Sequence, residues 1–196
     1  MANIIICNEL SGDIDLACKR GIAKAYFQEA VFINFHDIDH TVSIPFLGTG
    51  GSCAYYVQMV LKSGKKGTKL RLPDGGSSIK GFYDKSTTDN GYVEYMHKAQ
   101  ALIVGSDENT KCTVDKIDHG LFVIALQTKD GNIELYGWEN GLTTGDYTWD
   151  IVEGGGGTII PFQNKENEKE TMLPLIYKPQ AGGDADADFN SQFEQP

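Results

Sequence analysis

Apolar and polar residues alternate along much of this chain, with the two-residue period of a β-strand that buries one face. This pattern, together with runs of β-favouring apolar residues, predicts strands over residues 30–35, 54–61, 91–104, 121–126, 133–138, 147–152, 158–162 and 172–177. A weaker alternation predicts another half-buried strand at residues 14–18. Pro174 favours an edge position for the last strand, because proline has no N–H to donate across a sheet.

One segment departs from the alternation and predicts an α-helix over residues 107–119. Ser106 is a favourable N-cap, acidic residues occupy the first turn, and Gly120 suits the left-handed position that ends many helices. Turn signals at residues 74–76 and 89–91 separate neighbouring strands. The chain is therefore expected to form an antiparallel β-sandwich or barrel with one flanking helix.

The length of 196 residues fits one domain with extensions. We expect a single β-domain over residues 1–178. Within it, residues 62–91 are rich in Gly, Lys and Ser, too polar for a core, and predict an extended arm that contacts another copy. Residues 179–196 are rich in Gly, Ala, Asp and Gln, a composition that favours an acidic flexible C-terminal tail.

Charge and hydropathy narrow the class of protein. The chain has 17 basic and 27 acidic residues, a formal net charge of −10, which disfavours a general nucleic-acid-binding surface. No apolar run approaches the roughly 18 residues that span a bilayer. The N-terminus lacks the basic flank and long apolar run of a signal peptide. These observations predict a soluble protein that is not exported by this route.

The residue types that usually carry chemistry do not form a convincing site. The chain has four cysteines without a C-x-x-C pair, which favours four free thiols in a reducing cytosol, although their pairing stays open: Cys7, Cys18, Cys53 and Cys112. The cluster from His36 to His40 could hold a divalent metal, but a polar strand end or turn is the favoured interpretation. Gly48–Ser52 lacks the Gly-Lys-Ser/Thr of a phosphate loop.

Cys112 and His119 lack a third catalytic partner or an oxyanion device. We therefore expect no enzyme activity, no cofactor and no metal.

A basic stretch is the best candidate for a contact surface. Its five cations have no acid between them: Lys62, Lys65, Lys66, Lys69 and Arg71. We expect it to dock on the acidic surface of a neighbouring copy. The expected partners are Glu166, Glu168 and Glu170, or the acidic residues 184–188. A solvated hairpin tip is the alternative, and phosphate binding is disfavoured because no aromatic residues are interleaved.

The order of the segments resembles a known family. The segments 32–38, 91–104, 120–125 and 133–142, closed by Asp146-Tyr147 and a glycine-rich turn before 173–177, resemble tail tube (major tail) proteins of tailed bacteriophages, of the kind that infect Bacteroides-type gut bacteria. The resemblance covers most of residues 4–178 and is one of layout, without a single diagnostic motif.

The resemblance implies a virion structural protein, assembled in the cytoplasm of the host bacterium. Six copies would close a ring, and stacked rings would form a tube that conducts DNA without binding it specifically and contacts other tail proteins. An acidic lumen would let the duplex slide, which would place the basic stretch between rings. The alternatives are another virion component, such as a tail hub, terminator, connector or capsid decoration protein, or a small non-catalytic binding module.

Overall fold

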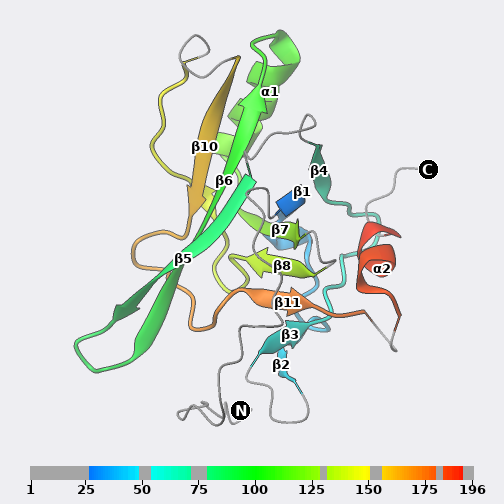
Figure 1. The fold of residues 1–196 in the computed structure, drawn as a ribbon, viewed down its shortest axis with the longest axis vertical. Helices are drawn as coiled ribbons and strands as arrows, with labels where there is room; N and C mark the ends of the chain where they lie inside the picture. The colour runs from blue at the N-terminus through cyan, green and yellow to red at the C-terminus, as the bar shows by residue number, and fades with distance from the viewer. Residues whose placement is uncertain are drawn as a thin grey trace, which may run out of the picture.

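The computed structural model describes residues 27–48, 54–71, 79–128, 132–150, 156–179 and 183–191. Strand outweighs helix by 44% to 15%, which confirms the mainly β fold. Two sheets face each other in a sandwich-like layout, with α1 (Glu108–Asp118) at one end of the long axis and a hairpin at the other (Figure 1).

The larger sheet has seven strands in the order β2-β3-β11-β8-β7-β1-β4. Their bounds are β1 Phe27–Asn34, β2 Phe46–Leu47, β3 Tyr55–Val57, β4 Thr68–Arg71, β7 Phe122–Thr128, β8 Ile133–Tyr136 and β11 Leu175–Tyr177. The pairing of β3 with β11 is parallel and the other pairings are antiparallel, so the larger sheet is mixed, whereas an antiparallel one was expected.

The smaller sheet has the order β5-β6-β10-β9 and is antiparallel. Its strands are β5 Ile79–Thr87, β6 Val93–Val104, β9 Thr143–Thr144 and β10 Gly157–Gln163. Two further elements complete the described chain, the 3₁₀ turn η1 Phe35–Asp37 and the helix α2 Ala185–Ser191.

The main core lies between the two sheets. Phe32 and Leu126 of the larger sheet pack against Ala99, Ala101 and Phe162 of the smaller one. A second core covers the opposite face of the larger sheet with β1 and β7 side chains that alternate with the first set. Because these central strands are buried on both faces, their sequences are continuous apolar runs.

One glycine sets how closely the sheets approach. A Cβ on Gly81 of β5 would lie 2.5 Å from Leu126 Cδ1 and 2.5 Å from Tyr136 Cζ. No side chain fits at that distance, so β5 crosses the larger sheet on bare backbone. From this contact, β5 continues into the β5–β6 hairpin.

Most of the predicted strands are confirmed. The ranges 30–35, 91–104, 121–126, 133–138 and 158–162 coincide with β1, β6, β7, β8 and β10. The ranges 54–61 and 172–177 shorten to β3 and β11, and residues 147–150 are not strand. Residues 14–18 and 151–152 lie outside the described residues.

The edge position predicted from Pro174 is wrong. Strand β11 lies between β3 and β8, and Pro174 precedes the strand, where no ladder hydrogen bond is lost. The helix prediction is confirmed, with a different cap. Asp107, not Ser106, is the N-cap, and its carboxylate accepts a hydrogen bond from Thr110 N at 2.7 Å.

The prediction of a flexible tail over residues 179–196 is wrong for residues 185–191, which form the helix α2. The described chain therefore has two α-helices, whereas the sequence predicted one. Phe189 is 2% exposed and its ring meets that of Tyr177 edge-on at 5.2 Å. The Tyr177 hydroxyl also donates to Asp188. Burial of Phe189 against the larger sheet offsets the weak helix propensity of this Asp-rich segment. Residues 192–196 lie outside the described part.

The predicted arm over residues 62–91 is divided. Residues 68–71 are β4, paired with β1 inside the larger sheet, and residues 72–78 are outside the description. Residues 79–87 are β5, paired with β6 along their whole length. The part that projects from the sandwich is the tip of the β5–β6 hairpin (Figure 1).

Candidate subunit interface

The predicted basic stretch is tied to its own fold. Lys62 Nζ donates to the His36 carbonyl at 2.7 Å, and Lys65 Nζ lies 3.1 Å from Asp37 Oδ1. The pKa of Asp37 is lowered, first by the hydrogen bond from the Asn34 side chain and then by Lys65. These contacts hold the stretch against η1, so it does not form a separate arm.

Of the remaining cations of the stretch, Lys69 also contacts its own fold. Lys69 Nζ donates to Asn190 Oδ1 of α2 at 2.8 Å. Lys66 is exposed, and Arg71 ends β4, opposite Glu29 in the register with β1. A role of these residues in contacts between copies stays a prediction.

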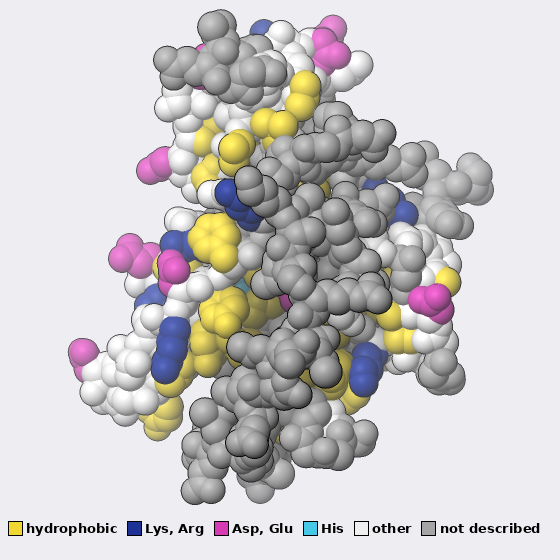
Figure 2. Space-filling model, in the orientation of Figure 1, with side chains coloured by type: hydrophobic (Ala, Val, Ile, Leu, Met, Phe, Trp, Pro, Cys, Tyr) yellow, Lys and Arg dark blue, Asp and Glu magenta, His cyan; other side chains and the backbone are white. Residues whose placement is uncertain are grey.

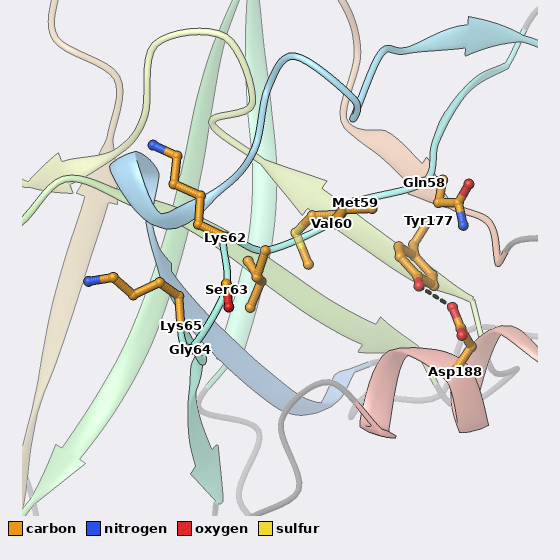
Figure 3. A pocket seen from close by; sticks show the side chains of 10 residues that line it. Gln58, Met59, Val60, Lys62, Ser63, Gly64, Lys65, Tyr177 and Asp188 are labelled. Atoms are coloured by element: carbon orange, nitrogen blue, oxygen red, sulfur yellow. Dashed lines mark hydrogen bonds between the residues drawn. The ribbon is translucent and has the colours of Figure 1, made fainter.

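The stretch borders a shallow pocket of about 390 Å³ between residues 58–65 and α2 (Figure 3). Tyr177 and Asp188, hydrogen-bonded to each other, close one end of it. The side chains of Lys62 and Lys65 point away from that pair (Figure 3). The pocket therefore lacks the converging polar groups of a small-molecule site.

The three predicted acidic partners separate into two kinds. Glu166 and Glu168 are exposed, and Glu168 Oε2 lies 3.5 Å from Lys165 Nζ. Glu170 is 1% exposed, so the expectation that it meets a neighbouring copy is wrong in this fold. Its carboxylate is directed inwards, where it binds backbone N–H groups.

Glu170 joins three segments of the chain. Its Oε2 accepts the Glu139 N–H at 2.7 Å, and its Oε1 accepts from Asn140 N at 3.2 Å and Asn164 Nδ2 at 2.8 Å. Burial raises the pKa of Glu170 to about 7, against the N–H donors, which lower it. These bonds satisfy a turn that would otherwise leave buried N–H groups without acceptors.

His97 of β6 continues this arrangement. Its ring Nδ1 accepts the Gly137 N–H at 3.1 Å, which assigns the proton to Nε2, and Nε2 donates to the Met172 carbonyl at 2.9 Å. Its backbone N–H donates to Asn164 Oδ1 at 2.7 Å. Burial lowers the pKa of His97 to about 4, so the ring is neutral. We call His97, Asn164 and Glu170 the Glu170 network.

The Glu170 network supports the base of the β5–β6 hairpin. The backbones of Tyr95 and Glu170 exchange two hydrogen bonds of 2.8 Å. Lys169 Nζ donates to Ser86 Oγ at 3.0 Å and lies 3.5 Å from Glu94 Oε2. Both strands of the hairpin therefore bind the same segment, Lys169–Glu170.

The β5–β6 hairpin carries exposed apolar residues on both sides of that base. Beyond it, Tyr92 is 72% exposed and Val93 39%. On its sandwich side, Tyr83 and Phe82, which pair with His97 and Lys98, are 45% and 39% exposed. Figure 2 shows hydrophobic side chains gathered on the hairpin and along β6 and β10. Sequence reasoning did not single out these residues, although an aromatic directly after the turn at residues 89–91 was a visible signal. Such a concentration on a projecting element is typical of a contact surface.

The cluster from His36 to His40 has a packing role. The His40 ring lies 4.8 Å from the Phe35 ring and 5.2 Å from the Trp138 ring. In the part of the chain that the structure describes, no group of three or more His, Cys, Asp or Glu side chains could hold a metal ion. No described helix has both the length and the apolar character to cross a membrane.

No protein-family model, curated protein or solved structure matches this chain.

Proposed function

We propose that the protein is a virion structural protein, a subunit of a phage tail tube made of stacked rings of six copies. The observation that carries this proposal is the β5–β6 hairpin, which projects beyond the sandwich with exposed aromatic residues. The turn at its tip is ordered by the Thr88 and Gly91 N–H groups, which donate to Tyr92 O and Thr88 O at 2.8 Å each. An ordered projection loses little entropy on binding.

The open edges of both sheets also support self-assembly. Strand β5 ends the smaller sheet, and β2 and β4 end the larger one. An edge strand presents backbone N–H and C=O groups with which another chain can pair. A head-to-tail contact between unlike surfaces, repeated around an axis, gives a ring.

The charge of the chain is compatible with a DNA conduit. At −10 per copy, a ring of six would carry 6 × −10 = −60 formal charges. A cationic wall would hold the duplex through phosphate contacts, whereas an acidic wall leaves it in water and free to slide. DNA would therefore pass without specific binding, and the partners would be further copies and other tail proteins.

The purified protein tests the proposal directly. We expect light scattering after size exclusion to show larger assemblies as the concentration rises, and negative-stain micrographs to show rings or short tubes. A chain that stays monomeric at the highest attainable concentration would contradict the tube and favour a small binding module.

A further inference from the structure

Two asparagines in this chain stand directly before a glycine, in the pairs Asn90-Gly91 and Asn140-Gly141. Such a pair can react without an enzyme. The backbone nitrogen of the glycine attacks the side-chain carbonyl carbon of the asparagine, and glycine has no Cβ to obstruct the approach. Because both pairs consist of the same two residues, a difference between them in the folded protein must come from the fold.

The pair Asn140-Gly141 is held by its surroundings. Asn140 Nδ2 donates to the Lys169 carbonyl at 2.9 Å, which fixes the side-chain amide. Gly141 is buried, and its N–H donates to Gly137 O at 3.0 Å. A Cβ on Gly141 would lie 2.6 Å from Leu121 Cδ1. The backbone nitrogen of this turn is therefore packed where it cannot rotate towards the side-chain carbonyl.

The pair Asn90-Gly91 lies in the exposed turn that joins β5 to β6. Within the described chain, the Asn90 side chain has no hydrogen-bond partner. A Cβ on Gly91 would meet nothing within 4 Å, so the backbone has room to rearrange. One bond opposes the reaction, from Gly91 N to Thr88 O at 2.8 Å. Since this turn packs on neither core, it opens at a smaller cost in free energy than the Asn140 turn.

We propose that Asn90 is a site of spontaneous deamidation, whereas the fold protects Asn140. Gly91 N loses its proton to hydroxide and bonds to Asn90 Cγ. The Cγ–Nδ2 bond then breaks, and the leaving nitrogen takes a proton from water and departs as ammonia. Water opens the resulting five-membered imide. Opening at Cγ gives an aspartate, and opening at the backbone carbonyl gives an isoaspartate. The net change is one water taken up and one ammonia released.

Either product alters the tip of the hairpin. Both add a carboxylate directly after Asp89, and the isoaspartate also lengthens the backbone of the turn by a methylene. The longer turn separates Gly91 N from Thr88 O and disorders the tip. Modified copies should therefore need a higher concentration to assemble than unmodified ones. This consequence rests on the proposed function, whereas the reaction at Asn90 does not.

Peptide mapping tests the site. The full-length protein is incubated in mildly alkaline buffer, digested with trypsin at intervals and analysed by mass spectrometry, where exchange of an amide for a carboxyl raises the peptide mass. Asn90 lies in the tryptic peptide 86–98 and Asn140 in 130–165, and fragment ions identify the modified residue. In the folded protein Asn90 should react about tenfold faster than Asn140 or more. In concentrated urea the two rates should converge.

Asn90→Ala is the matched control, because alanine has no side-chain carbonyl. Its hairpin peptide should keep its mass, while Asn140 reacts at its unchanged slow rate. Equal rates at Asn90 and Asn140 in the folded protein, or a faster reaction at Asn140, would overturn the inference.

Assembly of incubated protein tests the consequence separately. After incubation, the unmodified chain should assemble less well than a fresh sample, and Asn90→Ala should assemble as it did before. Deamidated protein that assembles like fresh protein would overturn the effect on the contact but not the site. A chain that never assembles would overturn the proposed function, while the mass spectra would still decide whether Asn90 reacts.

Discussion

At the scale of single residues, the most informative position is Glu170. It follows Glu166 and Glu168 at even spacing, yet only Glu170 is buried. Its carboxylate binds a turn, its backbone pairs with Tyr95, and it shares Asn164 with His97. The residue therefore links the centre of the sandwich to the base of the hairpin.

The two titratable members of the Glu170 network predict opposite pH effects. The folded pKa of His97 is about 4, below the ordinary 6.5, so the unfolded chain binds the extra proton and stability falls as pH drops from 6.5 to 4. The folded pKa of Glu170 is about 7, above the ordinary 4.5, so the folded chain binds the extra proton and stability falls as pH rises from 4.5 to 7. Between pH 4.5 and 6.5 the two effects offset each other.

Single substitutions should uncover each effect. Relative to the unmodified protein, Glu170→Gln should make stability rise with pH across this window, and His97→Gln should make it fall, with limiting slopes of about 1.4 kcal/mol per pH unit. Urea unfolding at several pH values measures the slopes. Parallel pH profiles for the three proteins would contradict the assignment.

Gly81 makes a second prediction at this scale. Gly81→Ala should destabilise the fold by about 1–3 kcal/mol, because its Cβ would overlap Leu126 and Tyr136 in a packed interior. Gly145→Ala is the matched control, since its Cβ would meet its nearest neighbour at 3.5 Å, an ordinary contact. Thermal unfolding of both variants measures the difference in stability. Equal melting temperatures would contradict the prediction and show that β5 can move away from Leu126 and Tyr136 at no cost.

At the scale of elements, α2 shows how the burial of one side chain holds a short helix against a sheet. Phe189 is buried against the second core, whereas the residues around it are polar. Lys69 and Asp188 add bonds between α2 and the larger sheet. The helix therefore covers the face of the sheet opposite the sandwich core.

Removing the Phe189 ring should cost as much as a core deletion. Phe189→Ala is expected to destabilise the protein by about 3–5 kcal/mol, through lost burial and the cavity left behind. Ser191→Ala, exposed on the same helix, should change stability by about 0.5 kcal/mol or less. Urea unfolding measures both, and similar small effects would mean that α2 does not cover the sheet.

At the scale of the whole molecule, the fold separates a packed sandwich from a projecting hairpin. The two cores lie in the sandwich, whereas the exposed aromatic residues Phe82, Tyr83 and Tyr92 lie on the hairpin. The base of the hairpin is fastened by Lys169 and Glu170, so the tip can be changed without opening a core.

A shortened hairpin should therefore fold and fail to assemble. Ser86 and Glu94 pair in register, so residues 87–93 can be replaced by Asn-Gly, which favours a two-residue turn. We expect an unchanged melting temperature and a monomer by light scattering at concentrations where the unmodified chain assembles. Normal assembly of this variant would place the subunit contact elsewhere.

The sequence by itself determined the elements whose signals are local. Alternation predicted β6 and β10, continuous apolar runs predicted β1 and β7, and capping residues predicted α1. Each of these signals depends only on residues a few positions apart in the sequence. Tertiary structure decided what depends on distant partners. Glu170 is buried because Glu139, Asn140 and Asn164 provide N–H donors, and β11 is central because β3 and β8 pair with it. Residues 185–191 form α2 because the Phe189 ring is buried on one face of the larger sheet. Lys62 and Lys65 bind their own chain because folding brings the His36 carbonyl and Asp37 next to them. None of these partners is adjacent in sequence, so no local pattern could have indicated them.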